Sequence, residues 1–483
     1  MSKQELGITV KKDENVSEWY TQVVKKAGLA DYAPVKGCMI IEPYGMKIWE
    51  RIKKKFNKMI EDEVDNAYFP LLIPESYLEK EKDIVEGFDP EVAWVENAGK
   101  DGKLEERLAI RPTSESIIAD YMSKNIRSYR DLPFRINQWA NIMRWEATDT
   151  RPFLRTREFL WQEGHTAHKS EENATEEVLK RLGQYAELFE DIMAIPVLKG
   201  KKPEHDKFPG ATVTTTVECL MPDGKSIQAG TSHNLGTNFA EAFEIEYEDE
   251  NQKKNKCHTT SWGISTRSIG ALILAHGDDK GLVMPPNIAP IEVVVVPILV
   301  GDNKEKVLEF SEKVKEELSS FRVKVDKNRD KSPGYKFNKW ELKGVPLRIE
   351  VGPNEVEDKE LTTVRRDNGE KQVLEFDGIS DKVEEILEDV QYELYKKLEK
   401  SREENTRTAE TLDEILDNID TYGGYVKTAW CGEEECEAKV KDEVHAEIVL
   451  LPFDKDVRSS DVGSECAICG EKSEEVVYFA KTY

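Results

Sequence analysis

The chain has 483 residues, too many for one hydrophobic core, and its length predicts about two to four domains. Hydrophobic residues make up 39% of it and charged residues 34%, which is typical of a globular protein with a strongly ionised surface. The longest apolar run, residues 293–300, is far shorter than the roughly 20 residues of a membrane-spanning helix. Because the N-terminus also lacks a hydrophobic signal segment, we expect no membrane association and a cytoplasmic location.

The net charge of −26 argues, as an average, against a nucleic-acid partner, since phosphate contacts need Lys and Arg. The charge is uneven, however. Residues 321–348 hold nine basic and three acidic side chains, a net of +6, whereas residues 402–483 hold nine basic and 21 acidic ones, a net of −12. A basic island in an acidic chain is what a local nucleic-acid footprint would look like, although a solvated charged face is the commoner cause of such a run.

The first elements along the chain are a helix and a strand. Apolar side chains recur every four residues between 45 and 66, which predicts an amphipathic helix. The segment AYFPLLIP, residues 67–74, is typical of a strand, but Pro70 cannot donate to a neighbouring strand, so we expect it at an edge or an interface. Residues 107–122 predict a short strand and then a helix that begins in PTSE. There a Ser or Thr hydroxyl can cap the start of the helix, and the positive end of the helix dipole favours a carboxylate.

The stretch from Asn141 to His168 is the densest in functional side chains. Strand-like residues flank a turn rich in Thr, Asp and Pro, which predicts two strands joined by a charged loop. Arginine offers a planar fork of donors to phosphate oxygens, an aromatic ring can stack on a base, and a carboxylate can hold a ligand amine. The alternative is a surface hairpin held by ion pairs. The side chains concerned are Arg144, Arg151, Arg155, Arg157, Glu146, Glu158, Glu163, Phe159 and Trp161.

Further along, QAGTSHNLG (228–236) places glycines around Thr231 and His233, and residues 259–279 predict a strand followed by a helix that begins near Arg267. PPNIAP (285–290) marks a linker. After it, strands at 291–300, 321–325 and 345–352 are combined with an amphipathic helix at 304–319. This order predicts a small α/β domain with a mixed or parallel sheet.

Seven cysteines, an odd number, do not indicate a disulfide framework. Four of them form two close pairs, which is the usual way to build a tetrahedral zinc site: Cys431, Cys436, Cys466 and Cys469. Glycines next to the pairs allow tight turns, and four unrelated buried thiols are the alternative. A closed four-thiolate site leaves no open coordination position, so we expect a structural role, remote from the chemistry. The other three, Cys38, Cys219 and Cys257, should act as small buried hydrophobes.

The pattern Arg-x-Glu, a variable loop, then Arg and Phe resembles motif 2 of the class II aminoacyl-tRNA synthetases. The string RPFLRTREFLWQEGHTAH (151–168) is similar to the archaeal and eukaryotic-like prolyl-tRNA synthetases, and matching segments follow in the family's order along nearly the whole chain. The resemblance implies an α+β multidomain protein. Its parts would be a class II catalytic domain built on an antiparallel sheet (1–287), an α/β anticodon-binding domain (288–400) and a small α/β zinc-binding domain (401–483). Motifs 1, 2 and 3 would lie at about 45–74, 141–168 and 259–279.

The resemblance also implies an activity, that of a proline–tRNA ligase. Such an enzyme joins L-proline to ATP as prolyl-adenylate, with Mg²⁺ on the phosphates, and then transfers the prolyl group to tRNA(Pro). Since the proline carboxylate is already a nucleophile, catalysis should consist mostly of positioning and charge neutralisation. The enzyme is expected to be a homodimer with a structural Zn²⁺. The family's members also end in a Tyr whose carboxylate points towards the active site, and YFAKTY fits that pattern.

Residue by residue, the resemblance assigns the following roles. The catalytic residues are Arg144 on the α-phosphate and Arg267 on the γ-phosphate. Further ATP-binding residues are Glu146, Arg155, Phe159, Gln228 and Thr231. The proline pocket is formed by Thr113, Glu115, Arg144, Trp161, Glu163, His165, His233, Ser261 and Trp262. The anticodon is read by Glu341, Lys343 and Arg348, since Arg can grip guanine edges and Glu can accept from amino groups. Pro70 lies in the dimer interface, and the zinc ligands are the four cysteines of the two close pairs.

One departure and two alternatives stand beside this interpretation. Ser265 and Thr266 precede Arg267 where the general motif 3 has a glycine-rich run and Glu, which we interpret as the prolyl-type variant. Another class II synthetase, such as the threonyl or histidyl enzyme, is one alternative, and a non-catalytic tRNA-binding paralogue is the other. The roughly ninety residues between motifs 2 and 3 leave no room for the large inserted editing domain of bacterial prolyl enzymes, and the sequence does not indicate how mischarged products are cleared.

Overall fold

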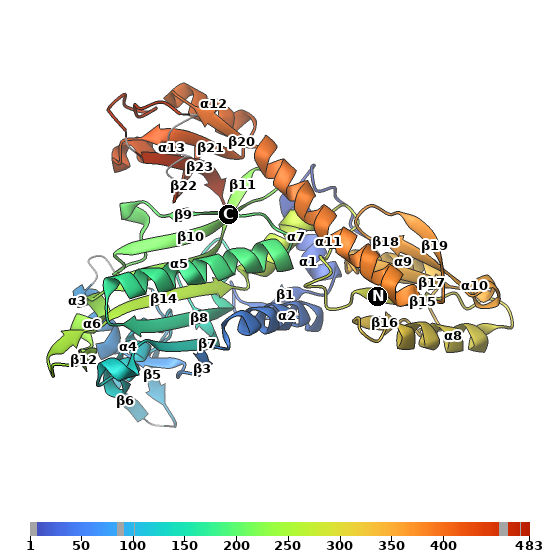
Figure 1. The fold of residues 1–483 in the computed structure, drawn as a ribbon, viewed down its shortest axis with the longest axis horizontal. Coiled ribbons are helices and arrows are strands. Elements are labelled where there is room, and N and C mark those ends of the chain that lie inside the picture. Colours follow the sequence, from blue (N-terminus) through green and yellow to red (C-terminus); the bar gives the residue numbers. More distant parts are fainter. Residues whose placement is uncertain (1–6, 85–90, 101, 454–461, 474) are drawn as a thin grey trace.

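The computed structural model describes residues 7–84, 91–100, 102–453, 462–473 and 475–483. Figure 1 shows an elongated molecule with a large sheet region at one end and a smaller sheet region at the other. The long helix α11 (Ile379–Glu404) runs between them, towards a C-terminal region that lies above the large sheet. Among the described residues, no helix is long and apolar enough to cross a membrane.

The large sheet has eleven strands in the order β20-β21-β23-β22-β9-β10-β11-β14-β8-β7-β3. Its strands in the first part of the chain are β3 (Asp65–Asn66), β7 (Phe134–Met143), β8 (Glu158–His168), β9 (Leu198–Lys201), β10 (Val213–Leu220), β11 (Lys225–Gly236) and β14 (His258–Ser265). From β9 to β7 every neighbouring pair is antiparallel. The predicted pair of strands joined by a charged loop is confirmed as β7 and β8.

Helices cover one face of this sheet, and α5 (Glu171–Glu187) lies along it (Figure 1). The side chains of β8 alternate between the two faces. The Tyr185 hydroxyl of α5 donates to Gln162 over 2.7 Å, and the neighbouring Gly164 lies under the ring of Trp262. That ring lies 6.2 Å from Phe56 of α2 (Pro43–Ile60), so these residues belong to the core. Glu163 and His165 therefore point to the opposite face.

The remaining elements of this region surround the sheet. They are the helices α1 (Val16–Lys26), α3 (Glu75–Ile84), α4 (Glu115–Asn125), α6 (Asn238–Ala242) and α7 (Arg267–His276), the hairpin β1 (Ala30–Tyr32) and β2 (Met39–Ile41), the strands β4 (Leu72–Pro74), β5 (Trp94–Ala98) and β6 (Gly102–Ile110) of a small sheet, and the pair β12 (Glu246–Glu248) and β13 (Lys254–Lys256). The helices predicted for motifs 1 and 3 and after PTSE are confirmed as α2, α7 and α4.

The strand predicted over 67–74, interrupted at Pro70, is present only in its last three residues, Leu72–Pro74. Residues 65–66 form β3 beside β7, residues 67–71 have no regular structure, and β4 joins a different sheet. Pro70 lies in the irregular part, where the missing N–H costs no ladder hydrogen bond.

The smaller sheet has the order β16-β15-β17-β18-β19. Its strands are β15 (Val293–Pro297), β16 (Val323–Val325), β17 (Leu347–Val351), β18 (Glu360–Arg365) and β19 (Lys371–Glu375), and its helices are α8 (Lys304–Glu317), α9 (Pro333–Leu342) and α10 (Pro353–Asp358). The first three strands are parallel and the last two antiparallel, which confirms the predicted mixed sheet. The basic segment, residues 321–348, contains α9, a helix that we did not predict from the sequence.

The C-terminal region contains β20 (Thr406–Ala409), α12 (Leu412–Thr421), β21 (Tyr425–Trp430), α13 (Glu434–Val444), β22 (Glu447–Pro452) and β23 (Glu475–Thr482). Its strands extend the large sheet: β22 pairs with β9, Leu451 opposite Lys201, and β23 pairs with β11, Lys481 opposite Lys225. The region is thus a small α/β unit, as expected, but it is joined to the catalytic sheet through backbone hydrogen bonds.

We expect Gly164→Ala to destabilise the protein, because a methyl group there would overlap the buried Trp262 ring. The loss in free energy of unfolding should be about 1–3 kcal/mol, as for other overpacked cores. Urea unfolding followed by fluorescence measures it. The control is Gly183→Ala in α5, where a Cβ would meet no atom within 4 Å and helix propensity should give a small gain. Equal stability of both variants would show that Trp262 does not pack as described.

Candidate active site

The uncovered face of the large sheet carries a cavity of about 330 Å³, lined mainly by β8, β11 and β14. A second hollow of about 210 Å³ adjoins it below the loop between β7 and β8. The two share four lining residues: Arg144, Phe159, Ser265 and Arg267. Of the residues predicted for ATP and proline, all but Thr113 line one or both hollows. The main cavity has Glu115, Trp161, Glu163, His165, Gln228, Thr231, His233, Ser261 and Trp262, and the second has Glu146 and Arg155.

Arginine side chains dominate the region where the hollows meet. Arg144 Nε lies 3.5 Å from the Pro112 carbonyl oxygen, and Arg267 Nε donates to the Leu154 carbonyl over 3.0 Å. Burial lowers the pKa of Arg267, and the positive charges of Arg144 and Arg155 lower it further. Three guanidinium groups that repel one another gain most from a polyanion between them, which makes this region suitable for phosphate groups.

Two aromatic rings adjoin the arginines. The rings of Phe159 and Trp161 are 6.3 Å apart and nearly perpendicular, and the Arg144 guanidinium lies 5.7 Å and 5.9 Å from their centroids. Both rings are half-buried and line the main cavity. The Trp161 indole N–H is buried without a partner, so a ligand acceptor could take its hydrogen bond.

The other end of the cavity is acidic. Glu163, 2% exposed, accepts hydrogen bonds from Ser114 Oγ at 2.6 Å and Gln138 Nε2 at 2.5 Å, and its second oxygen lies 3.0 Å from His165 Nε2. Glu115, also buried, accepts from the Thr113 hydroxyl. Thr113 therefore lies behind the cavity wall, where its hydroxyl holds the Glu115 carboxylate. A pair of buried, oriented carboxylates is suited to a ligand ammonium group.

Sequence reasoning missed two residues of this end. Ser114 was interpreted only as a possible helix cap, but its hydroxyl does not cap α4 and binds Glu163 instead. Gln138 stands directly opposite Glu163 in the β7–β8 register. Strand alternation could have identified Gln138, since its position in β7 shares a face with Glu163.

Two histidines of the cavity have opposite electrostatic environments. Burial lowers the pKa of His165, but the hydrogen bond to Glu163 and the charges of Glu115 and Glu163 outweigh it, so the pKa is raised above 6.5. Burial holds the pKa of His233 at about 3, with a further lowering by His165. The Nδ1 of His233 lies 3.0 Å from Thr214 Oγ1. The pKa values of the two imidazoles are thus shifted in opposite directions, and His233 is neutral near pH 7.

Three further parts of the cavity wall are Trp262, Ser261 and the segment 206–209. The Trp262 ring packs into the core, so this residue is a wall shared by core and cavity. Ser261 Oγ is buried without a partner. Sequence reasoning missed the segment Asp206, Lys207, Phe208 and Pro209, which lines the cavity although it carries no recognisable motif.

The residues predicted for the anticodon lie near the junction of the smaller sheet with the catalytic region. Arg348, with 13% of its side chain exposed, lies 3.0 Å from Glu350 and 3.7 Å from Glu341. Lys343 Nζ donates to the Ala27 carbonyl over 2.6 Å, and burial lowers its pKa to about 8. Lys343 thus already holds the two regions together and would have to leave this contact to bind RNA.

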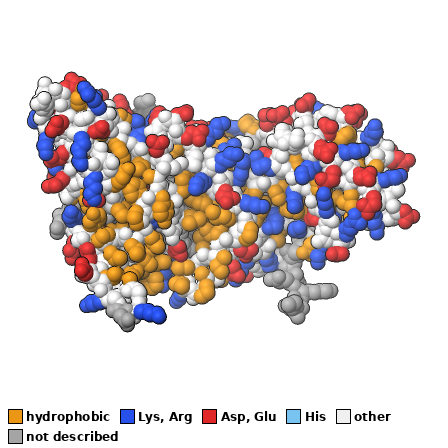
Figure 2. Space-filling view, turned by 90° about the horizontal axis from the view of Figure 1, so that it is seen from below, with side chains coloured by type: hydrophobic (Ala, Val, Ile, Leu, Met, Phe, Trp, Pro, Cys, Tyr) orange, Lys and Arg blue, Asp and Glu red, His pale blue; other side chains and the backbone are white. Residues whose placement is uncertain are grey.

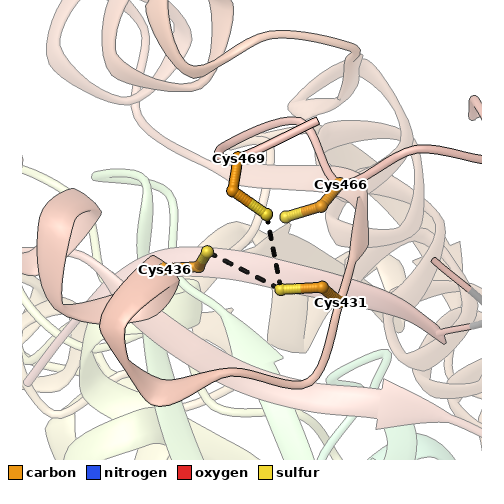
Figure 3. A group of neighbouring side chains, drawn as sticks. All are labelled: Cys431, Cys436, Cys466 and Cys469. Carbon is orange, nitrogen blue, oxygen red and sulfur yellow. Dashed lines mark hydrogen bonds between the residues drawn. The ribbon is translucent and has the colours of Figure 1, made fainter. Parts of the chain in front are cut away.

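The four cysteines of the predicted zinc site come together, as Figure 3 shows. Their sulfur atoms all lie within 4.8 Å of one another, with Cys431 Sγ 3.6 Å from Cys436 Sγ and 3.7 Å from Cys469 Sγ. Sulfurs bound tetrahedrally at about 2.3 Å from a zinc ion would be about 3.8 Å apart. The site could therefore hold a metal ion. The three other cysteines are buried, as expected.

Comparisons with known proteins match this architecture. Three family models fit: tRNA synthetase class II core domain (G, H, P, S and T) over residues 94–276, anticodon binding domain over 292–386, and prolyl-tRNA synthetase, C-terminal, over 412–483. The proline–tRNA ligase of Natronomonas pharaonis is 57% identical over 100% of both chains, and that of Clostridium novyi is 49% identical over 98% of this chain and 97% of its own. The chain belongs to the prolyl-tRNA synthetase family.

A solved structure agrees with this assignment to the prolyl-tRNA synthetase family. The crystal structure of prolyl-tRNA synthetase from Cryptosporidium parvum, complexed with halofuginone and AMPPNP, is 40% identical with a TM-score of 0.93 and covers 99% of this chain. The resemblance and the three-part fold expected from the sequence are thereby confirmed. Proline–tRNA ligases match over the full length, so the threonyl and histidyl alternatives are not supported.

We expect Glu163→Gln to lower the pKa of His165, because burial would then be opposed only by the charge of Glu115. Histidine NMR signals followed over pH measure this change in a chain with only seven histidines. His276, whose pKa burial lowers to about 4 and which contacts the Met193 carbonyl, is the internal reference and should not change. An unchanged His165 titration would contradict the described hydrogen bond.

Proposed function

We infer that the chain is a proline–tRNA ligase, which activates L-proline with ATP to prolyl-adenylate and transfers the prolyl group to the 3′ end of tRNA(Pro). The observation that carries this function is the polarity of one continuous cavity on a class II synthetase sheet. Its acidic end, with Glu115 and Glu163, fits an ammonium group, and its arginine-rich end fits a triphosphate. The full-length similarity to proline–tRNA ligases supports the choice of amino acid.

At the acidic end, Glu115, oriented by Thr113, would bind the secondary ammonium of proline. Glu163 and His165 form the hydrogen-bonded base of the pocket, with Trp161 and Trp262 as walls. The remaining pocket residues are His233 and Ser261. The proline carboxylate would then lie towards Arg144, which reaches both hollows.

At the basic end, Phe159 would stack on adenine and Arg267 would bind the γ-phosphate of a bent ATP. Arg155 would support the phosphate–adenine region, and Glu146, Gln228 and Thr231 would orient the nucleotide. Mg²⁺ would supply positive charge on the phosphate oxygens of the nucleotide, and it needs few protein ligands there. Among the described residues that line the second hollow, Glu146 is the one carboxylate that could hold it.

The first step needs no general base, because the proline carboxylate is ionised near neutral pH. Its oxygen attacks the α-phosphorus, the bond to the bridging oxygen breaks, and pyrophosphate leaves. Two anions must approach each other, so the guanidinium of Arg144 lowers the barrier by neutralising charge that grows on the α-phosphate. Arg267 holds the leaving group in line.

We assign tRNA binding to residues 288–400, the zinc-binding unit to residues 401–483 and catalysis to residues 1–287, although α11 continues through residue 400. Arg348 and Glu341, which lie close together within the basic segment, would read anticodon bases, and Lys343 would support them from the junction. Charging tRNA supports translation, and we place the enzyme in the cytoplasm for that reason.

We also propose a homodimer that includes Pro70. Apolar side chains near it are exposed, with Tyr68 71% and Leu72 37% accessible. Figure 2 shows hydrophobic side chains gathered over the face of the catalytic region seen from below. An exposed apolar area of this kind is typical of a protein–protein interface.

Amino-acid-dependent exchange of pyrophosphate into ATP, run with each of the twenty amino acids, tests the function, and we expect proline to give the strongest signal. Arg144→Ala should reduce proline-dependent exchange about 10²- to 10³-fold, since one oriented donor to a developing anion contributes about 3–4 kcal/mol. Arg130→Ala, which removes the same charge from an exposed site, should leave exchange unchanged. Exchange with another amino acid but not with proline would refute the function.

We expect one zinc ion per chain and its loss in the double variant Cys466→Ser/Cys469→Ser. Binding energy at such a site is folding energy, on the order of 10 kcal/mol, so the C-terminal region should unfold at lower temperature. Metal analysis by mass spectrometry and thermal unfolding measure both effects. The control Cys38→Ser removes a thiol outside the cluster and should keep the metal. Zinc-free wild-type protein purified without chelator would refute the site.

A further inference from the structure

The segment 202–209 passes along the open side of the cavity between β9 and β10. Its last four residues, from Asp206 to Pro209, line the cavity. The Phe208 ring lies 4.6 Å from the His233 ring, and the Phe208 N–H donates to Thr214 Oγ1 over 2.7 Å. Because Thr214 Oγ1 also contacts His233, the position of Phe208 and that of His233 are linked. The segment thus closes the end of the cavity where His233 lies.

The other side of this segment contacts the C-terminal region. His205 Nε2 lies 2.5 Å from Glu437 Oε2 on α13. Glu437 is buried, and its other oxygen accepts a hydrogen bond from the Ile448 N–H over 2.7 Å. Glu437 directly follows Cys436, one of the four clustered cysteines (Figure 3). A buried carboxylate with so few partners depends on each of them.

A second set of contacts begins at Lys202. Its Nζ lies 2.9 Å from Asp206 Oδ2 and 3.9 Å from Glu218 Oε1. The buried Glu218 accepts from Ser226 Oγ over 2.9 Å, and Ser226 Oγ lies 3.1 Å from the Tyr425 hydroxyl of β21. Just before Lys202, β9 pairs with β22 of the C-terminal region. The segment thus contacts that region directly through His205 and indirectly through the series Lys202, Glu218 and Ser226.

We propose that the C-terminal region positions residues 202–209 over the proline end of the cavity, and that His205 and Glu437 are positioning residues for proline binding. This inference rests on the proposed function, which places proline beside His233. The cysteine site then acts on substrate binding through α13, without touching the substrate. From the sequence we expected the cysteine site to be remote from the chemistry. The contact between His205 and Glu437 connects this site to the cavity through residues 202–209.

Removing the contact between His205 and Glu437 should weaken proline binding and leave ATP binding unchanged. When it is removed, residues 202–209 lose an anchor and cover the proline end of the cavity for a smaller share of the time. The arginine end is lined by the β7–β8 loop and α7, which do not contact Glu437. Proline should therefore bind more weakly, whereas ATP binding should not change.

The test uses full-length Glu437→Gln, His205→Gln and the double variant in proline-dependent pyrophosphate exchange. We expect the KM for proline to rise about three- to tenfold in each single variant, as for the loss of one close polar contact, with kcat and the KM for ATP nearly unchanged. The double variant should be no worse than the single ones, because both remove the same contact. The control Glu435→Gln neutralises an exposed carboxylate in the same turn of α13 and should behave as wild type.

Two outcomes would overturn the proposal. One is an unchanged KM for proline in both single variants, and the other is additive effects in the double variant. His205→Gln leaves α13 and its cysteine intact, so it gives an answer even if Glu437→Gln loses zinc or folds poorly. Wild-type protein without proline-dependent exchange would refute the proposed function instead, and the two failures are thereby distinguishable.

Discussion

One face of an antiparallel sheet carries the substrates, and the two-residue alternation of its strands decides which side chains reach them. In β8, Glu163 and His165 face the cavity, while the residues between and beside them pack under α2 and α5. A slip of one residue would exchange the two sets completely. Gly164 prevents such a slip, since only a residue without a side chain fits beneath Trp262. Core packing behind the sheet therefore fixes the chemistry in front of it.

The two ends of the cavity carry opposite charges. Carboxylates stand at the end that we propose for an ammonium group, and guanidinium groups stand at the end that we propose for phosphates. Arg144 lies where the two hollows meet, and it is the only predicted proline-binding residue among those that line both. This place suits a reaction in which a carboxylate approaches a phosphate. A cation between two anions stabilises them most when they are closest, which is in the transition state.

Local patterns in the sequence predicted much of this arrangement. The β7–β8 pair, the start of α7 at Arg267, the three strands between residues 291 and 352 and the cysteine cluster all follow from short-range signals, whereas α9 in the same range was missed. Other features depend on contacts between distant segments. The run 67–74 resembled a strand although its residues join different neighbours, and the pairing of β22 with β9 leaves no mark in either segment. Residues 206–209 reach the cavity only because of where the rest of the fold places them.

The two additional regions are attached to the catalytic sheet by different chemistry. The C-terminal region adds strands to the sheet, so it is joined to the sheet by several backbone hydrogen bonds that form and break together. The anticodon-binding region meets the catalytic region at a mixed junction. Polar side chains contribute there, such as Arg366 on Asp278 and Lys343 on the Ala27 carbonyl. The backbone contributes as well, because the Leu282 N–H donates to the Leu342 carbonyl over 3.1 Å, and Leu342 belongs to the core cluster of the catalytic region. Exposed polar contacts exchange with water at a small net cost, so the buried Leu342 and the backbone hydrogen bonds hold this junction in place.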